Sequence, residues 1–127
     1  MIDRVQIVGN VTEALKVLYP SNRFSRIDVH WMNDDELLEV NRTHLDHDYY
    51  TDIITFDYTR GSRISGELFI SKDRIKDNAD SLGVKEEEET ARVVAHGILH
   101  LLGFGDKTEE EARLMREKEN EVLAQLK

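Results

Sequence analysis

An apolar stretch near residue 100 places the strongest constraint on how this chain can fold. The segment HGILHLLGFGD, residues 96–106, carries two histidines four positions apart, followed by two glycines and a carboxylate. Apolar residues lie nearly all round the second half of a predicted helix from about Lys85 to Leu102, so we expect this helix to lie at the centre of the fold. With 127 residues, the chain has the size of one domain, and we predict a single domain over residues 1–127.

The remaining patterns predict an α+β fold. Alternating or β-rich sequences predict four strands, at residues 5–7, 26–31, 51–58 and 64–71, the last two forming a hairpin. Helical spacing and capping residues predict further helices at residues 10–20, 34–45, 73–83 and 108–127. We therefore expect a small mixed sheet packed with about five helices, with a metal site at the end of the central helix.

His96, His100 and Asp106 are the candidate metal ligands. The chain has no cysteine, so a metal site must use His, Asp or Glu. Residues four apart on a helix lie one turn apart on the same side, and glycines at 103 and 105 can adopt positive φ and turn the chain back. The alternative is two packed histidines and an aspartate that caps the next helix, but Thr108 and Glu111 already form a capping box.

Three protein ligands would leave a coordination position open, as in catalytic zinc sites. A metal there lowers the pKa of its bound water from about 15.7 to about 7 and can polarise a phosphoryl or carbonyl oxygen. Gly97 follows His96, where H-E-x-x-H metalloproteases have their glutamate. The sequence thus disfavours an ordinary zinc peptidase.

The charge distribution constrains the partners. The net charge of −9 opposes nonspecific attraction to nucleic acid, although residues 60–76 are locally basic. We find no apolar run of membrane-spanning length and no signal-peptide pattern in residues 1–10, so we expect a cytoplasmic protein without a membrane partner.

The segment 96–106 resembles the signature of the YbeY family of bacterial rRNA maturation endoribonucleases, H-G-x-L-H-L-x-G-Y-D-H. Upstream, YTDIITF (50–56) and GELFIS (66–71) resemble two further motifs of that family, in the same order. The resemblance implies an α+β metalloprotein that holds a zinc-like ion and cleaves single-stranded RNA in ribosome biogenesis. Its partners would then be precursor rRNA and ribosomal proteins or the small ribosomal subunit.

This chain departs from the family pattern at two positions. Asp106 stands where the third ligand is usually histidine. Its carboxylate oxygen is a harder ligand than an imidazole nitrogen. We expect one divalent ion, Zn²⁺ first, with other divalent metals admitted. Leu45 stands where the family has a functional arginine. Arg42, one helical turn earlier, is the candidate catalytic residue that would contact a phosphate, the alternative being an exposed helix arginine. His47 replaces a common lysine and could contact RNA or lie in a polar loop.

Two other functions stay open at this stage. One is a non-catalytic ribosome-assembly factor with a structural metal site, which the acidic charge and the missing arginine favour. The other is a non-haem iron oxygenase, which ranks last because such sites normally lie on β-scaffolds. Tyr49, Tyr50 and Tyr58 could stack on bases, but aromatic residues in strands more often belong to the core.

Overall fold

Three strands form a mixed sheet in the computed structural model, which describes residues 2–127. The central strand β3 (Arg63–Ser71) pairs in parallel with β1 (Arg23–Met32) and antiparallel with β2 (Ile53–Asp57). The predicted hairpin of β2 and β3 is confirmed, with Ile54 opposite Phe69 and Thr55 opposite Leu68. β2 is therefore one edge of the sheet.

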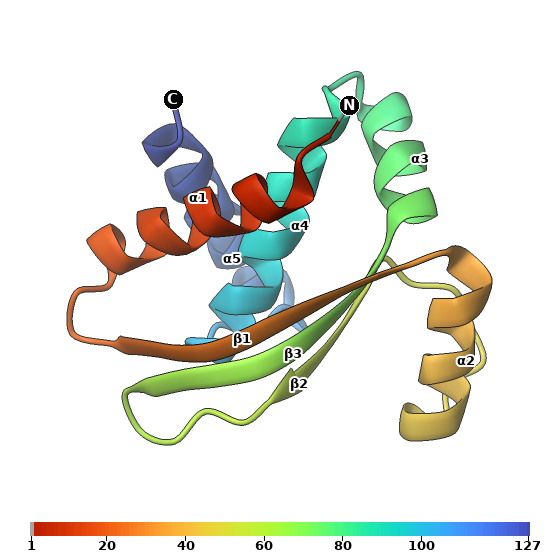
Figure 1. Ribbon diagram of the computed structural model, residues 1–127, viewed down its shortest axis with the longest axis horizontal. Coiled ribbons are helices and arrows are strands. Elements are labelled where there is room, and N and C mark those ends of the chain that lie inside the picture. The colour runs from red at the N-terminus through yellow and green to blue at the C-terminus, as the bar shows by residue number, and fades with distance from the viewer. Residues whose placement is uncertain (1) are drawn as a thin grey trace.

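Five helices accompany the sheet within residues 2–127, as predicted. Helix α4 (Glu86–Leu101) packs on one face of the sheet together with α1 (Arg4–Leu18) and α5 (Glu109–Gln125), while α3 (Lys72–Leu82) packs beside α4 and α2 (Asp34–Leu45) lies at one end (Figure 1). Asn33 and Thr108 form the capping boxes of α2 and α5, and Gly83 ends α3 in the left-handed conformation. The α+β class is confirmed.

The strand predicted at residues 5–7 is wrong, because these residues lie in α1. Asp3 caps the helix by accepting a hydrogen bond from the main-chain N–H of Gln6. Val5 is 82% exposed, whereas Val11 and Leu15 are fully buried. The apparent alternation is the first turn of a helix whose buried side begins after Val5. Three residues are too few to distinguish the two-residue period of a strand from the 3.6-residue period of a helix.

The central position predicted for the apolar helix is confirmed. Val94, Ile98 and Leu99 of α4 have no exposed surface. A Cβ on Gly97 would lie only 2.7 Å from Ile53 Cδ1, so the missing side chain lets β2 approach the helix closely. This contact brings the edge strand next to the two histidines that flank Gly97. None of the described helices is long and apolar enough to span a bilayer.

Candidate metal centre

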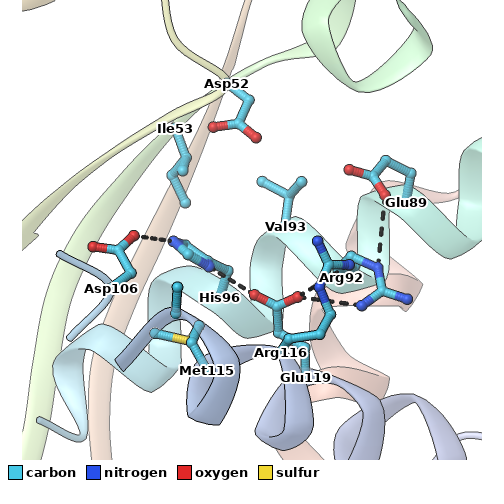
Figure 2. A pocket seen from close by; sticks show the side chains of 11 residues that line it. Asp52, Ile53, Glu89, Arg92, Val93, His96, Asp106, Met115, Arg116 and Glu119 are labelled. Carbon is cyan, nitrogen blue, oxygen red and sulfur yellow. Dashed lines mark hydrogen bonds and ion pairs between the residues drawn. The ribbon is translucent and has the colours of Figure 1, made fainter. Parts of the chain in front are cut away.

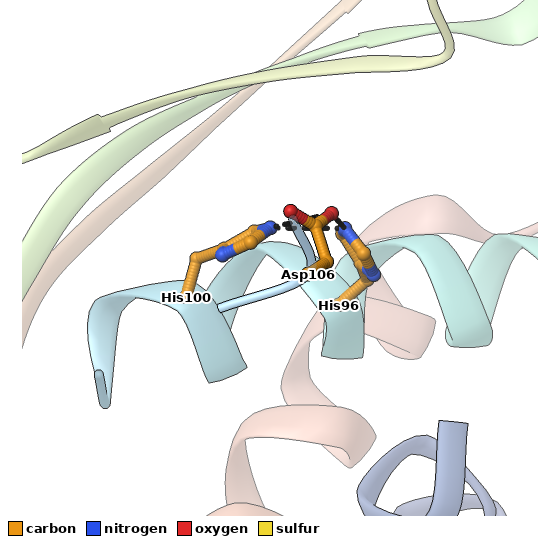
Figure 3. A group of neighbouring side chains, drawn as sticks. All are labelled: His96, His100 and Asp106. Carbon is orange, nitrogen blue, oxygen red and sulfur yellow. Dashed lines mark hydrogen bonds and ion pairs between the residues drawn. The ribbon is translucent and has the colours of Figure 1, made fainter. Parts of the chain in front are cut away.

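The structure brings His96, His100 and Asp106 together at the end of α4 (Figure 3). The Nε2 atoms of the two histidines are 3.0 Å apart. Asp106 Oδ2 lies 3.2 Å from Nε2 of His96 and 3.3 Å from Nε2 of His100. One atom from each side chain therefore points to a common centre.

A helix-ending turn returns Asp106 to the histidines. Gly103 has φ of 105°, its N–H bonds to the main-chain oxygen of His100, and the N–H of Phe104 bonds to that of Leu99. This pair of hydrogen bonds is a Schellman motif, which normally requires glycine at the left-handed position. The predicted reversal is confirmed at Gly103. Gly105 has no positive φ. Its lack of a side chain leaves space for the Glu111 carboxylate, which would lie 2.6 Å from an added Cβ.

Both imidazole rings are oriented through their Nδ1 atoms. Nδ1 of His96 lies 2.7 Å from Glu119 Oε2, and Nδ1 of His100 lies 2.9 Å from the main-chain oxygen of Phe104. Carbonyl and carboxylate oxygens accept hydrogen bonds, so each Nδ1 carries the hydrogen and each neutral ring presents a lone pair at Nε2. Two lone pairs and a carboxylate oxygen then face one another. These electron-rich atoms repel one another, and a cation bound between them would remove the repulsion.

The spacing of these three atoms suits a transition metal. Zinc binds histidine nitrogen at about 2.0–2.1 Å, so two ligands of a tetrahedral site lie about 3.3 Å apart. The observed separations of 3.0, 3.2 and 3.3 Å are close to this value. Two nitrogens and one oxygen also match zinc and its neighbours better than calcium, which takes six to eight oxygen ligands. The residues present therefore fit a divalent transition metal.

Glu119 of α5 links His96 to a buried charge network (Figure 2). Its side chain is buried, and Oε1 accepts a hydrogen bond of 3.2 Å from Nη1 of Arg92. Burial alone would raise the pKa of Glu119, but hydrogen bonds from His96 and Arg92 hold that pKa below its usual value. Burial is the largest single influence on His96 and lowers its pKa, but the hydrogen bond to Glu119 and the charges of Glu119, Asp106 and Asp52 together outweigh burial and raise that pKa. Such carboxylate partners fix the tautomer of a metal-binding histidine.

Sequence reasoning missed Glu119, which lies 23 positions after His96. A signal was present, because Met115, Glu119 and Val122 share the buried side of α5 and the glutamate interrupts an apolar stripe. Arg92 and Glu89, which precede His96 on α4, are paired with each other at 3.8 Å. Arg92 reaches His96 through Glu119, and Glu89 keeps one buried oxygen, Oε1, without a hydrogen-bond partner.

Two cavities meet at the candidate centre. One of about 480 Å³ extends from the three candidate ligands along β2 to the loop after α2, and one of about 340 Å³ lies over Arg92 and Glu119. Asp52, which precedes β2, lines both, and its burial raises its pKa although the nearby His96 opposes this. The centre is thus open to ligands from two sides.

Arg42, the candidate catalytic residue, lies outside both of these cavities. Its Nε bonds to Asp48 at 2.6 Å, and Nη1 lies 3.8 Å from Glu39. Leu45, at the position of the family arginine, does line the larger cavity. Among the residues described, no lysine or arginine lines that cavity, so its wall carries no permanent positive charge.

These features define an α+β protein with a three-residue candidate metal centre at the end of its central helix. Comparison with known proteins is consistent with this class. A family model described as Endoribonuclease YbeY matches residues 3–127. The chain belongs to the YbeY family.

Its relatives and a solved structure agree over most of the chain. The protein named Endoribonuclease YbeY from Bacteroides thetaiotaomicron is 52% identical over 102 residues, which are 80% of this chain and 74% of the relative. The protein of the same name from Christiangramia forsetii is 44% identical over 125 residues, 98% of this chain and 86% of the relative. The solution structure of TM1509 from Thermotoga maritima superposes with a TM-score of 0.68 at 25% identity, covering 96% of this chain and 82% of the other.

Proposed function

We propose that the chain cleaves single-stranded RNA at the site formed by His96, His100 and Asp106. Membership of the YbeY family identifies the activity as that of a hydrolytic endoribonuclease, whose substrate is RNA. The observation that carries the assignment to this site is the convergence of three acceptor atoms at 3.0–3.3 Å beside an open cavity.

The proposed ligands each have a defined task. When bound, a divalent ion supplies Lewis acidity and a bound water of lowered pKa. His96 and His100 hold their Nε2 atoms toward the centre because Glu119 and the main chain at Phe104 hold their Nδ1 atoms. Asp106 would supply one negative charge that offsets part of the ion's double positive charge.

The proposal extends to the identity of the ion, the RNA substrate, the partners and the compartment. We infer Zn²⁺ as the first candidate for the ion, with other divalent metals admitted by the Asp106 oxygen. We place the activity in rRNA maturation in the cytoplasm, with precursor rRNA as substrate and ribosomal proteins or the small subunit as partners, and assign it to one domain over residues 1–127. Arg42 remains a predicted phosphate contact that would first have to leave Asp48.

The test compares single substitutions of the candidate ligands. We expect His96→Ala, His100→Ala and Asp106→Ala to lose bound metal and RNA cleavage together while remaining folded. His44→Ala, which changes a histidine outside the cluster, should retain both. Metal content, melting temperature and cleavage of single-stranded against duplex RNA are the measurements.

One other function has specific support. The net charge of −9 and the lack of lysine and arginine around the larger cavity among residues 2–127 favour a non-catalytic ribosome-assembly factor with a structural metal. In that case metal-loaded wild-type protein would never cut RNA, and the ligand variants would only melt at lower temperature.

A further inference from the structure

The loop after α2 presents two stacked aromatic rings beside the candidate metal centre. The ring centroids of His47 and Tyr49 are 5.2 Å apart, with an angle of 23° between the planes. Tyr49 is 55% exposed. Both residues line the cavity of about 480 Å³ that also contains His96, His100 and Asp106. The rings and the candidate ligands therefore share one continuous surface.

The backbone of this loop is fixed by a buried side chain. Asn41 is only 2% exposed, and its Nδ2 donates a hydrogen bond of 2.9 Å to the main-chain oxygen of Tyr49. The main-chain oxygen of Asn41 accepts the N–H of His47 at 3.1 Å, and Asp46 between them adopts φ of 55°. The exposure of Tyr49 is thus a property of an anchored turn. The turn therefore holds the aromatic ring of Tyr49 in water, outside the hydrophobic core.

The chemistry of the cavity selects the kind of group that would cover this ring. Within this cavity, cationic side chains supply no phosphate contact, because no described lysine or arginine lines it. Arg42 is paired with Asp48 and Glu39, and Arg92 and Arg116 line the other cavity, on the far side of the centre from Tyr49. An aromatic face attracts the flat face of a nucleobase without needing charge, and stacking of this kind contributes about 1–3 kcal/mol per base.

We propose that Tyr49, backed by His47, is a stacking subsite for one unpaired nucleobase of the RNA whose backbone lies at the candidate metal centre. This inference rests on the proposed function and adds a residue that selects the substrate. A base within a duplex has both faces covered by its neighbours, so the subsite accepts a base only from a single strand.

The test uses Tyr49→Leu, which keeps an apolar side chain but removes the ring. Its matched control is Tyr58→Leu, because Tyr58 is also 55% exposed but lines a separate cavity, where its hydroxyl bonds to Glu67. The dissociation constant is measured for a short single-stranded oligonucleotide, with 2′-deoxy residues to limit cleavage and with strand integrity checked. We expect Tyr49→Leu to weaken binding about 5- to 150-fold, from the stacking energy of one base, and Tyr58→Leu to leave it within twofold.

A second oligonucleotide and a further variant show whether the lost affinity comes from base stacking. Wild-type protein should bind more weakly when an abasic residue replaces the stacked nucleotide, whereas Tyr49→Leu should bind both strands equally. Tyr49→Phe keeps the ring and loses only the hydroxyl contact to His47, so it should bind like wild type. Melting curves check that each variant is folded.

The outcomes separate this inference from the proposed function. If wild type cleaves RNA but Tyr49→Leu binds as wild type does, or loses affinity equally for intact and abasic strands, the stacking subsite is overturned alone. If metal-loaded wild type neither binds nor cleaves single strands, both the proposed function and the subsite are overturned.

Discussion

Replacing Glu119 with glutamine should weaken metal binding although Glu119 is not a candidate ligand. The variant keeps an oxygen that can accept the hydrogen bond of 2.7 Å from His96 Nδ1, but removes the negative charge. A hydrogen bond to a charged group contributes about 1.5–3 kcal/mol and a neutral one about 0.5–1.5. The difference of about 1–1.5 kcal/mol corresponds to a roughly tenfold weaker affinity of the centre. Glu119→Ala, which also removes the acceptor, should lose about 10- to 100-fold.

The assay is a competition titration of Zn²⁺ against a chelator of known affinity, repeated at several pH values. In the wild type, the carboxylate raises the pKa of His96, so protons compete with the metal more strongly there than in the glutamine variant. The affinity deficit of Glu119→Gln should therefore be largest above the raised pKa of His96 and shrink as the pH falls to 6. A role in folding alone would not produce this pH dependence.

The matched control is Glu117→Gln, which removes the same charge from an exposed position of α5. It should change the affinity for Zn²⁺ less than twofold. The reasoning is refuted if Glu119→Gln binds Zn²⁺ as tightly as wild type at pH 8, or if Glu117→Gln loses as much affinity.

Further substitutions test packing, burial and the arginine. Gly97→Ala should lower the free energy of unfolding by about 1–3 kcal/mol, because its Cβ would lie 2.7 Å from Ile53 Cδ1. A Cβ on Gly9 would have nothing within 4 Å, so Gly9→Ala should raise the free energy of unfolding by about 0.5–1 kcal/mol. Denaturant titrations measure both values, and a Gly97→Ala variant more stable than Gly9→Ala would contradict this reasoning. Burial raises the pKa of Glu89, so its ionisation destabilises the fold as the pH rises through that pKa. Glu89→Gln should raise the melting temperature by a few degrees at pH 7 and by less near pH 4, whereas an equal gain at both pH values would contradict this cause. Arg42→Ala should leave cleavage within a fewfold if its pairs with carboxylates persist on RNA binding, and a hundredfold loss in single-turnover rate would instead establish the phosphate contact.

The sequence predicts the local part of the candidate site well. Two histidines four apart on a helix must lie on one side of it, and the left-handed Gly103 decides where the chain goes next, so His96, His100 and Asp106 converge for reasons contained in eleven residues. The helices with strong capping residues, such as Asn33, were predicted for the same local reason.

Contacts between distant segments could not be predicted in this way. Glu119 reaches His96 only because α5 packs against α4, and no local pattern gives the angle between two helices. The sequence favoured a core position over an exposed one for Tyr49, as for other aromatic residues, but Tyr49 lies in a turn before β2 and is exposed. The strand predicted at residues 5–7 failed because a three-residue pattern fits both a strand and the first turn of a helix.

The three candidate ligands are close in sequence, whereas Glu119 joins them only through tertiary structure. An unfolded chain would therefore retain part of its capacity to chelate a cation through residues 96–106. Ligand binding stabilises a native state only by the excess of native over denatured affinity. The rise in melting temperature on adding metal would accordingly measure what the folded structure contributes to affinity, through helix α4, the turn at Gly103 and the packing of α5, and would underestimate the total binding free energy.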